Sequence, residues 1–175
     1  MKFRVLFFSI VLGLIISNSL SGQITWQGGA VGDETNWDND ANWVGGIKPS
    51  NSDDVIIPNS ITNYPVVSSG TCVAANLTLN ANGGSSNPSL TISSGRTLNI
   101  EGNFLMNGGT LVFQNSTFNC AGSWNDVSGA LNMQGTSTIN LDGNGTVSKN
   151  SAATNDFIFL NISGKNSSLL VSKAC

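Results

Sequence analysis

Apolar and polar residues alternate in short triplets that return at a nearly constant interval along this chain. Five triplets read apolar–polar–apolar, and their spacings are 21, 20, 21 and 21 residues. They are Leu77-Thr78-Leu79, Leu98-Asn99-Ile100, Phe118-Asn119-Cys120, Ile139-Asn140-Leu141 and Leu160-Asn161-Ile162. Such alternation is typical of a β-strand, in which the outer two side chains of a triplet point to the same face. The spacing predicts that one structural unit repeats throughout this region.

Two further series keep the same period. Apolar pairs recur 21 and 20 residues apart, and the next expected pair is degenerate; the series is Leu90/Ile92, Leu111/Phe113, Leu131/Met133 and Ala152/Thr154. A glycine follows each of the last four triplets by two residues, at Gly102, Gly122, Gly143 and Gly164. Phe104 and Trp124 occupy matching positions just after the first two of these glycines. A recurring glycine suits a tight corner or a positive φ angle.

A unit with short strands and a glycine corner is one turn of a coil, and such a coil is not stable alone. Ordering its backbone costs roughly 1–2 kcal/mol per residue, whereas each buried large apolar side chain contributes only roughly 1.5–3 kcal/mol. Stacking of coils closes the interior and pairs the backbone groups. We therefore expect an all-β, right-handed parallel β-helix over residues 71–175. The alternative, a β-sandwich, also has regularly spaced short strands but does not require one repeated motif.

If equivalent positions of successive coils stack, the central asparagines of four triplets lie in one column. These residues are Asn99, Asn119, Asn140 and Asn161. Stacked amides can hydrogen-bond along the axis of a β assembly, so the sequence predicts a structural ladder. The functional alternative is a ligand-binding stripe.

Residues 23–70 differ in composition from the repeats and hold Trp26, Trp37 and Trp43. The exposed end of a solenoid needs a cap, and we expect the tryptophans to cover the open end of the apolar interior. The alternative is a carbohydrate platform on which the indole faces stack. Asp38, Asp40 and Asn42 have the alternating oxygen spacing of a calcium loop. The match ends at Trp43, where such a loop has glycine, so calcium is only a weak candidate.

The N-terminus indicates export. Lys2 and Arg4 precede the apolar run from Val5 to Ile16, and a small polar stretch follows, which together predict a cleavable signal peptide over residues 1–22. The run is short for a bilayer span, which needs about 20 residues, so we expect no transmembrane segment after cleavage; an uncleaved anchor is the alternative. The remaining chain carries ten acidic and five basic residues, a net charge of −5. Nucleic acid and anionic membranes are therefore poor partners.

The chain has three cysteines, Cys72, Cys120 and Cys175, and no histidine. No pair of cysteines has metal-ligand spacing, which speaks against zinc and haem sites; we expect no cofactor. A Cys72–Cys120 disulfide is one interpretation. The other is that Cys120, which stands where other triplets have Leu or Ile, is a small buried apolar residue.

The N-terminal motifs together resemble a known family. Trp26, Trp37 and Asn42-Trp43 are followed by Asp54-Val55-Ile56-Ile57-Pro58 and Asn63-Tyr64-Pro65, which lead into the repeats. This arrangement is similar to large exported surface proteins of Bacteroidetes, the adhesin-like or autotransporter-like β-helix proteins with a pectin-lyase-like fold. The resemblance implies cell-surface or extracellular location and export through the type IX secretion route. Family members continue for many more coils, so we expect this chain to be an N-terminal fragment.

Export, repeats and low charge favour a non-catalytic structural or adhesive module that contacts extracellular glycans or other surface proteins. A second hypothesis is a polysaccharide lyase or hydrolase, because Glu101 and Asp142 hold equivalent positions two coils apart. About 10 Å would separate their backbones, close to the range of an inverting pair, although Ala121 fills the coil between them. A third is a flat face toward ice or mineral, but Thr78, Thr91, Thr97 and Thr110 do not repeat strictly.

Overall fold

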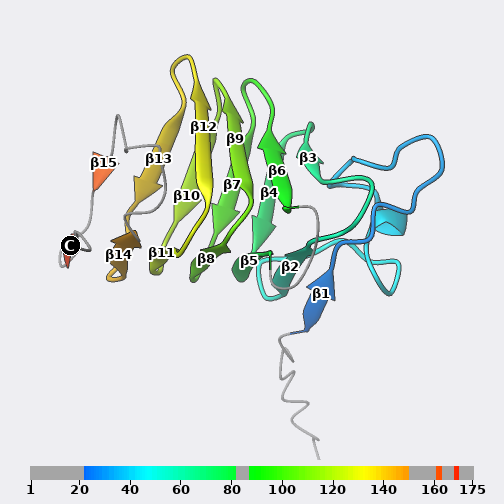
Figure 1. Ribbon diagram of the computed structural model, residues 1–175, viewed down its shortest axis with the longest axis horizontal. Coiled ribbons are helices and arrows are strands. Elements are labelled where there is room, and N and C mark those ends of the chain that lie inside the picture. The colour runs from blue at the N-terminus through cyan, green and yellow to red at the C-terminus, as the bar shows by residue number, and fades with distance from the viewer. Residues whose placement is uncertain (1–21, 82–86, 150–160, 163–167, 170–175) are drawn as a thin grey trace, which may run out of the picture.

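The computed structural model describes residues 22–81, 87–149, 161–162 and 168–169. Parallel strands wind in successive coils, and three sheets form the walls of the resulting rod (Figure 1). Every pairing between the described strands is parallel. The prediction of a parallel β-helix is thus confirmed, and the β-sandwich, whose sheets are antiparallel, is wrong.

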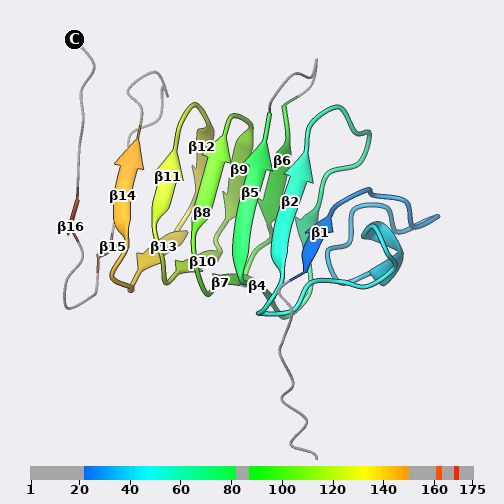
Figure 2. The ribbon, with the colours of Figure 1, turned by 90° about the horizontal axis from the view of Figure 1, so that it is seen from below.

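The seven-stranded sheet has the order β1-β2-β5-β8-β11-β14-β16 and runs along the rod in Figure 2. Its strands are Gln23–Thr25 (β1), Asp54–Pro58 (β2), Asn76–Asn80 (β5), Phe104–Asn107 (β8), Trp124–Asp126 (β11), Thr146–Lys149 (β14) and Ser168–Leu169 (β16).

The other two walls are a five-stranded sheet, β15-β13-β10-β7-β4, and a four-stranded sheet, β12-β9-β6-β3. The five-stranded sheet contains Thr71–Ala74 (β4), Thr97–Ile100 (β7), Thr117–Cys120 (β10), Thr138–Leu141 (β13) and Asn161–Ile162 (β15). The four-stranded sheet contains Val66–Val67 (β3), Ser89–Ile92 (β6), Thr110–Gln114 (β9) and Ala130–Gln134 (β12).

The repeated apolar residues form columns inside the rod. Leu98 pairs with Phe118, and Phe118 pairs with Ile139, all three fully buried. The column predicted from the spacing is confirmed for these residues, while Leu160 lies outside the described part of the chain. On the neighbouring wall Leu90, Leu111 and Leu131 also stack in register.

Two of the series from the sequence, the apolar pairs and the glycines with their following aromatic residues, can be followed only in part. The Ala152/Thr154 pair lies outside the described residues, as does Gly164. Trp124 stacks on Phe104 as expected, and its next partner is Val147. The interval from Trp124 to Val147 is longer than the usual period, because extra residues occupy the preceding corner.

The first triplet does not belong to the column in which its spacing placed it. Leu77 pairs with Phe104 in the seven-stranded sheet, whereas Cys72 is the neighbour of Leu98. The reason is the length of this coil: the register joins residues 72 and 98, which are 26 positions apart. Additional residues between β5 and β6 lengthen the coil, so the 21-residue interval from Leu77 to Leu98 joins two different walls.

The recurring glycines serve close approach and not a positive φ angle, because none of the described ones, Gly102, Gly122 and Gly143, has φ in that region. A Cβ on Gly122 would lie 2.5 Å from the carbonyl carbon of Gly102 in the coil before. A Cβ on Gly143 would collide with the backbone of Ala121. The corners of successive coils therefore pack backbone to backbone.

The N-terminal segment begins the solenoid as well as closing its end. β1, β2 and β3 lie within the sheets, and a short 3-10 helix, Asp40–Asn42 (η1), lies between β1 and β2 in the chain. The indole rings of Trp26 and Trp37 each contact Trp43 edge to face at 4.8 Å. The three tryptophans are continuous with the apolar interior of the coils.

Within the described residues, no helix has the length and apolar character needed to cross a membrane. The predicted signal peptide, residues 1–22, lies almost wholly outside the described part of the chain.

Substitution of Gly122 by alanine should lower the free energy of unfolding by about 1–3 kcal/mol, because the methyl group forces two coils apart. A urea unfolding midpoint measures the loss. Gly29→Ala is the matched control, since its Cβ meets no atom closer than 3.5 Å. Equal midpoints for the two variants would contradict the close packing of corners.

Phe118→Ala should lower the free energy of unfolding by about 3–5 kcal/mol, because it empties the centre of an aromatic cluster. The Phe118 ring lies 5.1 Å from that of Phe104 and 5.3 Å from that of Trp124. Leu105→Ala, on the outer face of β8, should lower it by only about 1 kcal/mol. Similar losses in denaturant titrations of both variants would show that the inward and outward positions are misassigned.

Candidate functional site

The three N-terminal tryptophans present no face to a sugar. Trp26, Trp37 and Trp43 are at most 1% exposed, and their rings contact one another. The Nε1 of Trp26 donates to the Asn63 carbonyl oxygen at 2.7 Å, and that of Trp43 donates to the Trp37 carbonyl oxygen at 2.8 Å. The carbohydrate-platform interpretation is therefore wrong, because an indole must be accessible on one face to stack on a pyranose ring.

The calcium hypothesis is also wrong for these residues. Asn42 is fully buried, and its Oδ1 accepts from the Ala30 amide at 2.8 Å while its Nδ2 donates to two backbone carbonyls. One oxygen of Asp40 accepts from the backbone amide of Lys48 at 2.9 Å. The three side chains thus fasten different parts of the loop and do not converge. Among the described residues, no group of three or more His, Cys, Asp or Glu is placed to hold a metal ion.

Asp38 instead joins the N-terminal segment to the first coil. Its Oδ1 accepts from Lys48 Nζ at 2.8 Å, and its Oδ2 accepts from the hydroxyl of Ser69. Partial burial opposes ionisation, but the hydrogen bonds from Lys48 and Ser69 outweigh it and hold the pKa of Asp38 below its ordinary value. Asp38 is therefore an ionised structural anchor.

The two described cysteines are buried free thiols, so the Cys72–Cys120 disulfide is wrong. They lie on β4 and β10, and β7 runs between these strands. Burial raises the pKa of Cys72 to about 12 and that of Cys120 to about 11. Since the thiolate is the reactive form, both are poor nucleophiles. Cys175 lies outside the described residues.

The asparagine column lies on the outer face of the five-stranded sheet. Asn119 Nδ2 donates to Asn99 Oδ1, and Asn140 Nδ2 donates to Asn119 Oδ1, both at 2.7 Å. The amides therefore form a continuous ladder over three coils. Asn161 pairs with Asn140 through the backbone register, and its side chain lies outside the description.

A shallow groove of about 210 Å³ adjoins this ladder and contains both carboxylates of the enzyme hypothesis. Glu101 and Asp142 are exposed, and Ala121 separates them in the intervening coil. The structure thus brings the pair to one groove in the order expected from the repeat.

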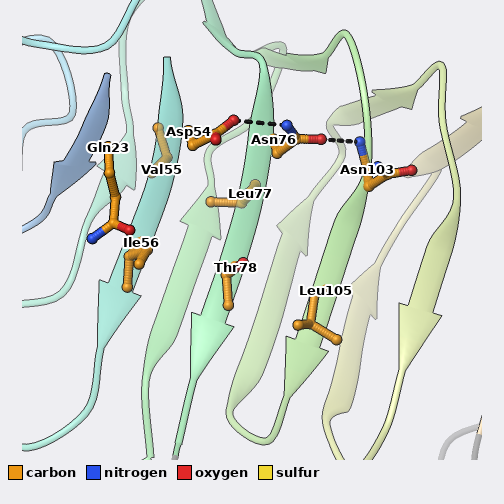
Figure 3. Close-up of a pocket in the computed structure, with 9 residues that line it drawn as sticks. All are labelled: Gln23, Asp54, Val55, Ile56, Asn76, Leu77, Thr78, Asn103 and Leu105. Atoms are coloured by element: carbon orange, nitrogen blue, oxygen red, sulfur yellow. Dashed lines mark hydrogen bonds between the residues drawn. The ribbon is translucent and has the colours of Figure 1, made fainter. Parts of the chain in front are cut away.

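A larger depression of about 370 Å³ lies on the outer face of the seven-stranded sheet (Figure 3). Ile56, Thr78 and Leu105 are neighbours in register on β2, β5 and β8, and each is half-buried. They form a floor that is mainly apolar. This volume falls in the range of small-ligand sites, about 300–1,000 Å³.

A polar row borders this floor, and Figure 3 shows Asn76 bonded to Asp54 on one side and to Asn103 on the other. Asn76 Nδ2 donates to Asp54 Oδ1 at 2.7 Å, and Asn76 Oδ1 accepts from the backbone amide of Asn103 at 2.6 Å. Asn103 Oδ1 in turn accepts from the amide of Ser123 at 2.9 Å. The row leaves the second oxygen of Asp54 and the Asn103 Nδ2 available to a ligand.

The sequence analysis missed this depression. Its polar row stands immediately before the strand residues Leu77 and Phe104, a position at which a short polar side chain recurs. That recurrence was the available signal. The recurrence is not evident from the spacing, because the interval groups Leu77 with Leu98 and not with its true neighbour Phe104.

Comparison with known proteins identifies a family but no characterised relative. No curated protein and no solved structure matches the chain. Residues 25–166 match the family model described as a domain of unknown function, DUF8693. This match includes the tryptophan segment and most of the coils. The chain therefore belongs to the DUF8693 family.

Proposed function

We propose that this chain is a non-catalytic structural and adhesive module of the cell surface or extracellular space, and that it binds glycans in the depression between β2, β5 and β8. The observation that carries the proposal is the combination of an apolar floor with a polar row. Sugar rings offer the same combination of apolar C–H faces and hydroxyl edges.

The apolar floor and the polar row line the same depression, so one ligand can contact both. Ile56, Thr78 and Leu105 succeed one another along the rod, so a ring can rest on them and cross from coil to coil. The Asp54 carboxylate and the Asn103 amide border the same side. Hydrogen bonds to a charged group are stronger than those between neutral groups, so Asp54 is the principal polar contact in this proposal.

Export is part of the proposal. Two basic residues followed by the apolar run from Val5 to Ile16 support a signal peptide. The resemblance to Bacteroidetes surface proteins supports a surface location and the type IX route. A surface protein built as a rod can also serve as a spacer.

A polysaccharide-active enzyme is the second candidate, and the groove with Glu101 and Asp142 favours it. Two coils of spacing correspond to about 9.6 Å between backbones, near the upper limit of about 9.5 Å for an inverting pair of carboxyl groups. Both carboxylates are exposed, and Ala121 stands between them in the intervening coil. We therefore rank binding above catalysis.

Glycan binding by the purified protein should weaken about tenfold in Asp54→Asn, because a hydrogen bond to a charged group contributes about 1.5 kcal/mol. A glycan array identifies the ligand, and titration calorimetry measures the affinity. Thr78→Lys, which fills the floor, should abolish binding.

Asp142→Asn is the matched control, because it makes the same change at an exposed carboxylate on another wall. A blank array, or equal weakening in Asp54→Asn and Asp142→Asn, would contradict the proposed site. Release of reducing or unsaturated ends from a polysaccharide, lost in Asp142→Asn, would favour the enzyme instead.

A further inference from the structure

The five-stranded sheet carries a second column that the sequence analysis did not recognise. Thr71, Thr97, Thr117 and Thr138 stand in register on four successive strands. Their side chains share the outer face with the asparagine ladder, because Leu98, Phe118 and Ile139 between them point inward. The chain therefore repeats Thr-x-Asn on three adjacent coils.

The hydroxyl groups of this column are not engaged by other described residues, and each threonine is exposed or half-buried. Along the ladder Asn99 accepts one hydrogen bond, Asn119 accepts one and donates one, and Asn140 donates one. An amide has two N–H groups and two lone pairs, so each of the three keeps hydrogen-bonding capacity beyond the ladder. The face thus presents a regular grid: about 4.8 Å between strands and about 6.6 Å between the two columns, which are two residues apart on each strand.

No charged residue lies within this grid. Its eight described positions are the four threonines, the three ladder asparagines and Val73, which pairs with Asn99. Glu101 and Asp142 lie beyond its edge. A neutral surface that repeats over several coils is better suited to an extended partner than to a single small ligand, which needs a concave site. It is suited to a partner that is itself periodic and uncharged.

Ice is such a partner, and the chemistry of the grid matches it. The spacing between strands is close to the repeat of water oxygens along a principal axis of hexagonal ice. Each threonine supplies a hydroxyl that can replace a lattice water, and a methyl group beside which water is ordered. Waters bound between the two columns can be held by hydroxyls on one side and amides on the other.

We infer that the outer face of β4, β7, β10 and β13 is an ice-binding surface. This activity is separate from the proposed glycan site, which lies on another wall of the rod, and it does not depend on it. The alternative occupant of the face is a polysaccharide with a regular repeat.

Thermal hysteresis and inhibition of ice recrystallisation by the purified protein test the inference. Thr117→Lys, at the centre of the grid, should lose most of both activities at equal protein concentration. Thr97→Lys should do the same. Thr78→Lys is the matched control, because it makes the same change at a half-buried strand position on another wall, and should retain both activities. Circular dichroism melting curves verify that each variant is folded.

The inference is overturned if the folded wild-type protein neither shifts the freezing point nor limits crystal growth. It is also overturned if Thr78→Lys loses as much activity as Thr117→Lys. Loss of binding to an insoluble polysaccharide in Thr117→Lys, without any effect on ice, would assign the face to the alternative occupant.

Discussion

Parallel backbone pairing between coils is the interaction on which the rest of this structure depends. Each coil uses the hydrogen-bonding groups of its strands on the coils before and after it, so no coil is complete by itself. This register forces like side chains to stack. It puts Leu98, Phe118 and Ile139 inside the rod and Asn99, Asn119 and Asn140 outside it. The core, the amide ladder and the threonine grid are three consequences of one constraint.

The corners impose a second constraint. Successive corners approach so closely that Gly122 leaves no room for a Cβ. At the neighbouring positions Asn76 and Asn103 use their side-chain oxygens to accept the next coil's backbone amide. These bonds satisfy donors that a turn would otherwise leave without a protein partner. Short polar residues and glycines at corners are thus as much a part of the repeat as the apolar columns.

The sequence predicted the architecture well because a constant interval translates directly into stacking. It predicted the coil, two inward columns and the order of the asparagines. It misplaced Leu77, because the extra residues of the longer coil happen to keep a 21-residue interval between Leu77 and Leu98, which lie in different sheets. It predicted that the tryptophans form a cap, but it left a carbohydrate platform open as the alternative, because aromatic residues occur both in cores and at binding surfaces. The threonine grid went unrecognised for a related reason: Thr71 belongs to the lengthened coil, and threonines on other walls obscured the column.

The most direct test of the stacking is disulfide cross-linking of introduced cysteine pairs in Thr78→Cys/Leu105→Cys and Thr78→Cys/Asn99→Cys. Adjacent strands lie about 4.8 Å apart, within the range that a disulfide requires, about 4.4–6.8 Å between Cα atoms. The native Cys72 and Cys120 are buried, and Cys175→Ser in both variants removes the third native thiol. The register predicts rapid oxidation of the 78–105 pair and none of the 78–99 pair. Preferential cross-linking of residues 78 and 99 would contradict the coil-to-coil register and with it the whole arrangement of faces.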